Sequence, residues 1–383
     1  MEQFPKKLLT KLSERRDNNA LRRLPNPNGL IDFSSNDYLG LAKNEEVFNH
    51  AMKLLKEHGL IRNGATGSRL LSGNHELYFE LERKLADFHK TEAALVFNSG
   101  YDANIGFFST VPQRGDIVFY DELIHASIRD GIKMGNAKSY KFKHDDLEDL
   151  KRKCHVEHNR GSQEAEVYIV TESVFSMDGD SPDLQAMAKF CTSNNFHLVV
   201  DEAHAIGVYG ENGVGLVQEK GLQDQVFARI ITFGKAIGCH GAAILGSNVL
   251  INYLVNFARS FIYTTGLPPH SMATIIASYK NLSSSGYPQQ KLQKKIQLFN
   301  LEVEQLGLQG SFIKSSSAIH CCIVPGNDTV KSVSQKISDK GFDVRPILSP
   351  TVATAKERLR FCVHSYNSTE EIKEVLRLLD SYI

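Results

Sequence analysis

Short apolar runs alternate with helix-like patterns through the middle of the chain. Between residues 75 and 89, Leu77, Leu81 and Leu85 lie on one helical face, which predicts an amphipathic helix. Strand-like runs then occupy residues 93–97, 117–120, 167–170, 198–200, 230–232 and 242–245. Several of these runs are apolar at consecutive positions, as expected of strands that are covered on both faces. The alternation predicts a mainly parallel α/β sheet.

The two ends of the chain have a different pattern. The first 30 residues are charged, with leucines at helical spacing, and the prolines of the turn at 25–29 end this helix. Beyond the turn at 266–269, a broken helical stretch leads to β-like runs and a final amphipathic helix. We therefore expect an N-terminal arm, a large α/β domain and a small α+β domain, over residues 1–45, 46–270 and 271–383.

Composition excludes several classes of function. The 383 residues include 44 Lys+Arg and 44 Asp+Glu, so no global basic field exists for nucleic acid or an anionic membrane. An apolar content of 42% favours a packed core. No apolar stretch approaches the roughly 18 residues that span a bilayer, and the first residues lack a signal peptide's apolar core. Six cysteines without a CxxC pair favour reduced thiols, so we expect a cytoplasmic enzyme.

Several motifs are present only in part. Residues 201–204 spell a helicase box, but no G-x-x-x-x-G-K-[ST] phosphate loop accompanies it. Residues 178–180 imitate a calcium loop without its correctly placed glycine or its distal Glu. Cys154, His155 and His158 have metal-ligand spacing, but their charged surroundings are more typical of a solvated surface. We predict no metal site.

Three signals at strand ends point to one cofactor. The run 198–200 leads to Asp201, whose buried charge needs a cation such as a protonated pyridine nitrogen. Lys235 follows the run 230–232 and can form a Schiff base with an aldehyde. Residues 99–101 precede a helix whose first amides suit a phosphate. Aldehyde, pyridine and phosphate together make pyridoxal 5′-phosphate (PLP).

Each of these residues has a simpler explanation when it is taken singly. Lys235 could be a surface lysine, Asp201 a helix cap and Gly100 a turn residue. His125 could begin a helix, and Arg22 could lie on a solvated helix face. The conjunction at consecutive strand ends favours the cofactor, because α/β sheets bind ligands at that edge.

Longer segments resemble the α-oxoamine synthases, which are PLP enzymes of fold type I. The matching segments are 33–41, 171–180, 201–204, 232–235, 263–269 and 358–360. The resemblance covers nearly the whole chain. It implies a mainly parallel seven-stranded sheet with helices on both faces, preceded by a short N-terminal arm and followed by a small α+β C-terminal domain.

The resemblance also implies a role for each site residue. Lys235 would bond the cofactor's aldehyde and move the α-proton, Asp201 would hold the ring nitrogen, and His125 would stack on the ring. The other cofactor-binding residues implied are Gly100, Tyr101, Ser176, His204, Thr232, Thr264 and Thr265. The substrate-binding residues implied are Arg22, Asn36, Gly67, Ser68, Thr351 and Arg360. Thr264 and Thr265 would reach the cofactor from a neighbouring subunit, so a homodimer is expected.

The implied reaction condenses an amino acid with an acyl thioester and releases the thiol and carbon dioxide. The favoured pair is L-alanine and a pimeloyl thioester, of CoA or of a carrier protein, in biotin biosynthesis. Glycine acyltransferases that make 2-amino-3-ketobutyrate or 5-aminolevulinate, serine palmitoyltransferases and a PLP-free scaffold stay open as alternatives. Departures from the family pattern at 205–206, 236–240 and Gly266 lie near the cofactor region and could change the choice of substrate.

Overall fold

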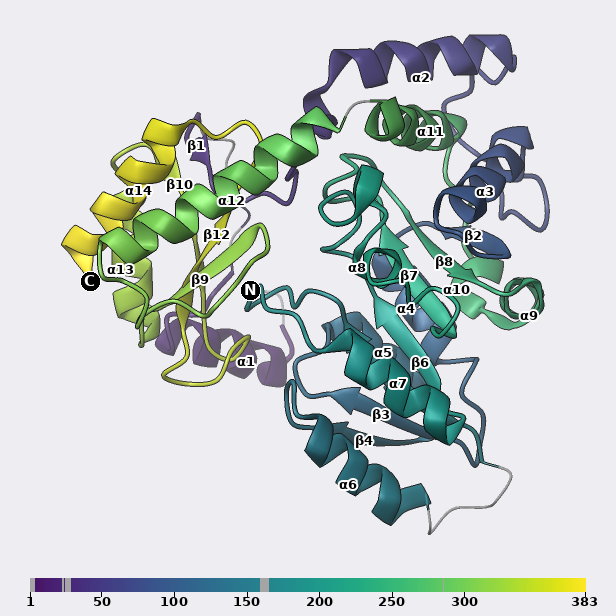
Figure 1. The fold of residues 1–383 in the computed structure, drawn as a ribbon, viewed down its shortest axis with the longest axis horizontal. Helices are drawn as coiled ribbons and strands as arrows, with labels where there is room; N and C mark the ends of the chain where they lie inside the picture. The colour runs from purple at the N-terminus through teal and green to yellow at the C-terminus, as the bar shows by residue number, and fades with distance from the viewer. Residues whose placement is uncertain (1–3, 23, 25–28, 159–164, 285) are drawn as a thin grey trace. The chain divides into compact units, whose positions relative to one another are not determined.

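The computed structural model describes the whole chain except residues 1–3, 23, 25–28, 159–164 and 285 (Figure 1). Contacts within the chain define two compact units. The large unit comprises residues 36–176 and 181–290, and the small unit comprises residues 1–35, 177–180 and 291–383. The expected boundaries lay after residues 45 and 270, whereas the two units divide the chain elsewhere. The division into an arm, a large domain and a small domain stays a prediction.

A seven-stranded sheet forms the centre of the large unit (Figure 1). The strands, in their spatial order, are β2 (Ala93–Phe97), β8 (Ala242–Gly246), β7 (Ala228–Thr232), β6 (His197–Asp201), β5 (Val167–Glu172), β3 (Ile117–Asp121) and β4 (Lys138–Phe142). The five strands from β7 to β4 are mutually parallel, and β8 pairs antiparallel with both of its neighbours. The mainly parallel seven-stranded sheet expected from the sequence is confirmed.

Apolar side chains cover this sheet on both faces. In β3, Val118 packs into one core with helices α4 (Gly100–Phe108) and α5 (Ala126–Met134), whereas Ile117 and Phe119 pack into a second core with α6 (Leu147–His158) and α7 (Leu184–Asn194). Successive residues of a strand point to opposite faces, so a strand buried on both sides is apolar throughout. Strand β4 was not expected, because it lies at the sheet edge and Phe142 is its only buried residue.

Helices and short turns connect the strands of the large unit. The α-helices are α2 (Glu45–Glu57), α3 (Glu76–Phe88), α4 (Gly100–Phe108), α5 (Ala126–Met134), α6 (Leu147–His158), α7 (Leu184–Asn194), α8 (Leu216–Glu219), α9 (Asn248–Phe257), α10 (Arg259–Ile262) and α11 (Pro269–Ser284). The 3₁₀ helices are η1 (Leu41–Lys43) and η2 (Glu211–Gly213). Helix α12 (Tyr287–Gln305) contains the boundary between the two units. The helix predicted over 75–89 is therefore confirmed as α3.

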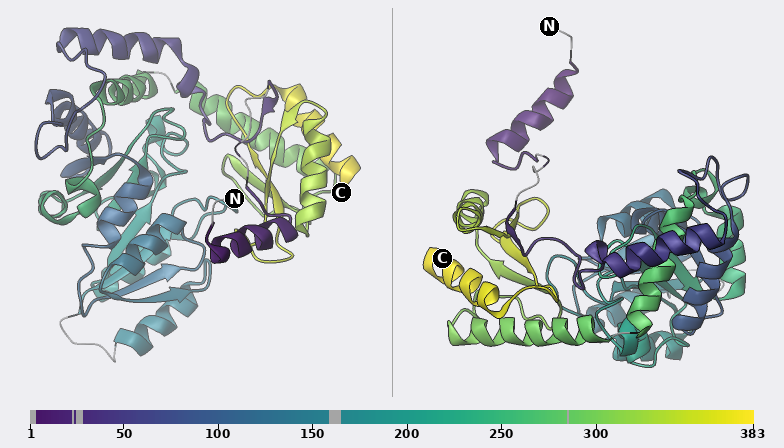
Figure 2. Two further views of the ribbon diagram at one scale, coloured as in Figure 1. Left: turned by 180° about the vertical axis from the view of Figure 1, so that it is seen from behind. Right: turned by 90° about the horizontal axis from the view of Figure 1, so that it is seen from above.

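The small unit combines the N-terminal arm with the C-terminal part of the chain (Figure 2). Its elements are α1 (Lys6–Asp17), β1 (Ile31–Asp32), β9 (Ile319–Ile323), α13 (Asn327–Ser338), β10 (Phe342–Asp343), β11 (Arg345–Ile347), β12 (Arg358–Cys362) and α14 (Thr369–Tyr382). Strand β1 pairs in parallel with β10, while β11, β12 and β9 form an antiparallel sheet. Residues 1–35 of the expected arm belong to this unit, because strand β1 is hydrogen-bonded there.

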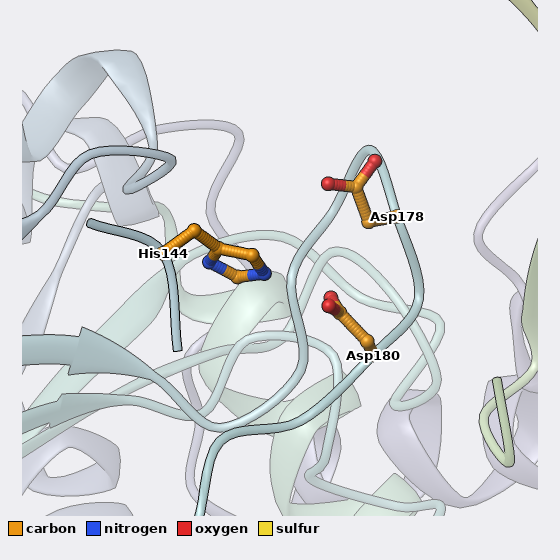
Figure 3. A group of neighbouring side chains, drawn as sticks. All are labelled: His144, Asp178 and Asp180. Atoms are coloured by element: carbon orange, nitrogen blue, oxygen red, sulfur yellow. The ribbon is translucent and has the colours of Figure 1, made fainter. Parts of the chain in front are cut away.

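Asp178, from the incomplete calcium loop at 178–180, and Cys154, from the Cys/His segment, each have contacts within their own unit. Figure 3 draws His144 with Asp178 and Asp180. In the large unit, His144 Nδ1 lies 3.0 Å from Asp121 Oδ1, and in the small unit Asp178 forms an ion pair with Arg358. Cys154 is buried in the core, where burial raises the pKa of its thiol to about 12.

No helix among the described residues is long and apolar enough to cross a membrane.

Acid is expected to destabilise the protein through His320. This residue is buried in β9 with its ring stacked on Phe299 at 4.3 Å between centroids, and its Nε2 has no hydrogen-bond partner among the described residues. Burial lowers the pKa of His320 from 6.5 to about 3. Between these values the unfolded chain binds the proton and the folded chain does not, so stability is lost as the pH falls. From pH 6.5 to pH 5 the free energy of unfolding should fall by about 2 kcal/mol from this group.

Urea unfolding at several pH values would test this expectation. A His320→Leu variant removes the titrating group and should have a shallower loss of stability between pH 6.5 and pH 4 than the wild type. The same slope in both proteins would contradict the assignment.

Candidate active site

The carboxyl ends of β6 and β7 bring the two main predicted residues to one edge of the sheet. The strands are parallel neighbours, with Asp201 opposite Ile230. Asp201 is the last residue of β6, and Lys235 follows the end of β7 by three residues. Ligands of α/β sheets bind at this edge. The juxtaposition expected from strand ends is therefore present.

Lys235 begins a chain of hydrogen bonds that has one consistent direction. Its Nζ lies 2.7 Å from His204 Nε2, and His204 Nδ1 lies 2.7 Å from the Tyr38 hydroxyl oxygen. Tyr38 donates its proton to Asn36 Oδ1 at 3.1 Å. The hydroxyl therefore accepts from His204 Nδ1–H, and Nε2 accepts from the lysine amine. These hydrogen bonds hold His204 in one tautomer and fix the direction of the Lys235 amine.

A second chain connects Asp201 to His125. Asp201 is buried, and its Oδ1 accepts from the Ala203 N–H at 2.9 Å. The Asn104 amide donates to both Asp201 Oδ2 and Ser127 Oγ at 3.0 Å. His125 Nδ1 accepts from the Ser127 backbone N–H at 3.2 Å, so this nitrogen carries no proton and the Ser127 hydroxyl donates to it at 2.7 Å. Burial lowers the pKa of His125, against the opposing effect of the nearby Asp201 carboxylate. His125 is therefore an acceptor at Nδ1.

The start of α4 forms an anion-binding position. Ser99 caps the helix by accepting from the Asp102 N–H at 3.1 Å. The amides of Gly100 and Tyr101 lie in the first turn, where a helix leaves its N–H groups without intrahelical partners. A Cβ on Gly100 would meet Thr232 Oγ1 at 3.7 Å, so glycine keeps the approach between them open. The predicted phosphate-binding residues Gly100, Tyr101 and Thr232 thus lie around one helix end.

Thr264 and Thr265 lie beside this helix end within the same chain. The Asn98 amide donates to Thr264 Oγ1 at 3.0 Å and to the Thr265 carbonyl oxygen at 2.7 Å. Asn98 directly precedes the helix cap. The predicted contribution of both threonines to a neighbouring subunit stays a prediction.

Gly67 and Ser68, two of the predicted substrate-binding residues, lie in a tight loop of the large unit. The Gly67 carbonyl oxygen accepts from the Gly266 N–H at 2.9 Å, and the Ser68 carbonyl oxygen accepts from the Gly73 N–H, also at 2.9 Å. A Cβ on Gly73 would lie 2.1 Å from the Gly67 carbonyl oxygen, so only glycine fits. Gly266, which departs from the family pattern, is therefore part of this loop.

The remaining predicted residues divide between the units. Ser176 is half-buried at the end of a large-unit segment. In the small unit, Arg22 Nη2 donates to Thr351 Oγ1 at 3.5 Å on the surface, and the buried Arg360 donates to Cys362 Sγ at 3.0 Å. The assembly of these groups with the large-unit residues stays a prediction.

Sequence reasoning missed four residues that hold the site residues. Tyr38, Asn104 and Ser127 belong to the two hydrogen-bond chains, and the fourth is Glu172, whose Oε1 accepts from the His125 backbone N–H at 2.6 Å. Tyr38 and Glu172 lie in segments that carried the family resemblance, so a signal existed for them. Asn104 lies in the middle of helix α4, where an amide has no sequence signature of this role.

A family model now identifies the chain. The model for aminotransferase class I and II matches residues 28–379. The chain belongs to the aminotransferase class I and II family. It is therefore a PLP-dependent enzyme, as expected from the strand-end residues.

Similar proteins indicate which group of enzymes within this family the chain belongs to. An 8-amino-7-oxononanoate synthase of Emericella nidulans is 37% identical over 404 residues, covering 100% of this chain and 98% of the relative. A solved 8-amino-7-oxononanoate synthase of Francisella tularensis has a TM-score of 0.77 at 29% identity, covering 92% of this chain and 97% of the other. A solved serine palmitoyltransferase from S. paucimobilis with a bound PLP–myriocin aldimine has a TM-score of 0.87 at 26% identity. The match covers 98% of this chain and 96% of the palmitoyltransferase. The family member described here is accordingly an acyltransferase of the α-oxoamine synthase group.

The residues at the sheet edge have the chemistry that PLP requires. Lys235 supplies an amine for the aldehyde, and the buried Asp201 supplies a carboxylate for the ring nitrogen. The start of α4 and Thr232 supply amide and hydroxyl donors for the phosphate. The site of this family member therefore fits PLP.

Proposed function

We propose that the protein condenses L-alanine with a pimeloyl thioester, of CoA or of a carrier protein, to give 8-amino-7-oxononanoate in biotin biosynthesis. The observation that carries this proposal is the 37% identity to a synthase of that name, over the full length of both chains. The Cα–H bond of alanine breaks, and a new bond joins Cα to the acyl carbon as the C–S bond of the thioester breaks and the thiolate leaves. The bond between Cα and the carboxylate carbon then breaks, and carbon dioxide leaves. Cα and the thiolate each take up a proton, one of which came from Cα and the other from water.

Bound PLP would supply an electron sink for the carbon that loses its proton. Lys235 would hold and return that proton, because the hydrogen bonds through His204 and Tyr38 fix the direction of its amine. When the amine takes a proton, His204 Nε2 accepts a hydrogen bond from it. Lys235 thus keeps its orientation in both protonation states.

Asp201 would hold the ring nitrogen in its protonated form. Its carboxylate has a fixed orientation, since the Ala203 N–H and the Asn104 amide each hold one of its oxygens. His125, held through Ser127, would cover the face of the ring. Preorganised groups of this kind need no reorientation during the reaction.

Substrate contacts complete the proposal. Asn36 and Arg360 would bind the carboxylate of alanine, because a guanidinium forms paired hydrogen bonds with it. Arg22 and Thr351, with the loop at 67–68, would line the path of the acyl thioester.

We further propose that the active unit is a homodimer. Leu71 is 85% exposed and Tyr263 is 72% exposed, and they flank the loop joined by Gly67 and Gly266. Large exposed apolar side chains in one region favour a protein interface. Light scattering should give a mass of about twice that of the chain, and a monomeric active enzyme would contradict the proposal.

A substrate matrix tests the proposed reaction. Thiol release should be fastest with L-alanine and pimeloyl-CoA, compared with glycine plus acetyl- or succinyl-CoA and with serine plus palmitoyl-CoA. We expect a preference of at least about tenfold, since the wrong amino acid or acyl chain changes contacts worth 1–3 kcal/mol. Faster release with glycine would assign the protein to the glycine acyltransferases.

Serine palmitoyltransferase is the second candidate, because a structure of that enzyme has a TM-score of 0.87 with this chain. Its identity of 26% is lower than the 37% of the synthase relative. Faster release with serine and palmitoyl-CoA would select this candidate. A wild-type protein that neither binds PLP nor releases thiol would favour the scaffold alternative.

A further inference from the structure

Glu172 is a buried carboxyl group beside the cofactor residues. It is the last residue of β5, it is 3% exposed, and it lies opposite Asp201 in the register of β5 and β6. Its Oε1 accepts a hydrogen bond from the backbone N–H of His125 at 2.6 Å. Glu172 thus joins the end of β5 to the residue that precedes helix α5.

His125 is consequently held at two points. Glu172 holds its backbone, while Ser127 donates its hydroxyl to Nδ1 at 2.7 Å. Ser127 is in turn held by Asn104, which also binds Asp201. The position of the imidazole relative to the Asp201 carboxylate therefore depends on both contacts. Loss of either contact would allow the ring to rotate or shift.

Burial and the neighbouring charged groups affect the protonation of the Glu172 carboxyl group. Burial and the nearby Asp201 carboxylate raise the pKa of Glu172 to about 8, with Asp121 acting in the same direction. The Lys235 amine and the hydrogen bond from His125 oppose this shift. This shift of the pKa favours the protonated form of the Glu172 carboxyl group. That form can accept from the His125 amide without placing a second negative charge beside Asp201.

We propose that Glu172 is a positioning residue that fixes His125 over the cofactor position through the His125 backbone amide. This inference rests on the proposed function, because it assigns His125 to the face of the PLP ring. It predicts that the hydrogen-bond acceptor of Glu172 is needed and that its negative charge is not.

Two substitutions separate these requirements. Glu172→Gln keeps a neutral acceptor of the same length, whereas Glu172→Ala leaves the His125 amide unpaired. The Kd for PLP should stay within twofold of the wild type in Glu172→Gln and rise about tenfold in Glu172→Ala. The visible circular dichroism of bound PLP, which reports the ring environment, should change only in Glu172→Ala. Thr171→Ser, on the preceding buried residue of β5, is the matched control and should change neither signal.

The apo protein provides a readout that does not depend on turnover. An acid whose pKa is raised on folding stabilises less as the pH rises from its unfolded value of 4.5 to about 8. The melting temperature of Glu172→Gln should therefore rise relative to the wild type between pH 5 and pH 8. A difference that stays constant across this range would show that Glu172 is ionised and would overturn the inference.

The outcomes distinguish this inference from the proposed function. A Glu172→Gln variant as impaired as Glu172→Ala would show that the charge matters, and a Glu172→Ala variant equal to the wild type would show that Glu172 has no positioning role. If Glu172→Ala does not fold, Glu172→Asp replaces it, since its shorter side chain does not reach the amide. A wild type that binds no PLP would instead reject the proposed function.

Discussion

Replacing Lys235 by alanine is expected to abolish the visible absorption of lysine-bound PLP and to lower turnover by about a thousandfold or more. The amine is the group that would bond the aldehyde and carry the α-proton, and its contact with His204 at 2.7 Å directs it to that position. An alanine side chain can do neither task. Absorption spectra of the purified variant with added PLP, together with thiol release from pimeloyl-CoA, would measure both effects.

Lys220→Ala is the matched control for the Lys235 prediction. Lys220 is exposed at the C-terminal end of helix α8. This variant should keep the absorption band and the turnover of the wild type. A Lys235→Ala protein that retained the band, or more than one tenth of the turnover, would remove Lys235 from the proposed mechanism.

Glu202→Gln is expected to lower the free energy of unfolding by about 3–5 kcal/mol. Glu202 directly follows Asp201 and is completely buried, and its Oε2 lies 2.7 Å from Arg229 Nε and 2.6 Å from Nη2. Arg229 is 3% exposed. Neutralising the carboxylate leaves a buried guanidinium without a counter-charge, which costs far more than the loss of one surface ion pair. Urea unfolding at pH 7 would measure the loss.

Two comparisons test the cause of this loss. Glu172→Gln changes the same residue type at the end of the adjacent strand, but it replaces a neutral acid and should cost less than about 1 kcal/mol. A double variant, Glu202→Leu with Arg229→Met, removes both charges and should be more stable than Glu202→Gln. A double variant that is less stable than the single one would contradict the ion-pair explanation.

Local patterns were sufficient to predict the central sheet. Strands such as β5 and β6 are covered on both faces, so each contains a run of consecutive apolar residues that is visible without any knowledge of its neighbours. Strand β4 lacks this signal because it lies at the edge, and its residues are mostly polar. The pairing of β1 with β10 joins residues more than 300 positions apart, and two-residue strands have no periodicity to detect.

Some features of the candidate site were likewise predictable from the sequence, and others depend on the tertiary structure. Asp201, Lys235 and the capped start of α4 each follow an apolar strand directly, so the sequence alone determined that an acid, an amine and an anion-binding helix end meet at one sheet edge. Only the tertiary structure decided how they are held. Tyr38, Asn104 and Glu172 come from separate elements, and their hydrogen bonds depend on directions and distances that no local pattern records. Burial and the neighbouring Asp201 carboxylate, which also follow from packing, raise the pKa of Glu172, while the buried Glu202 is paired with Arg229.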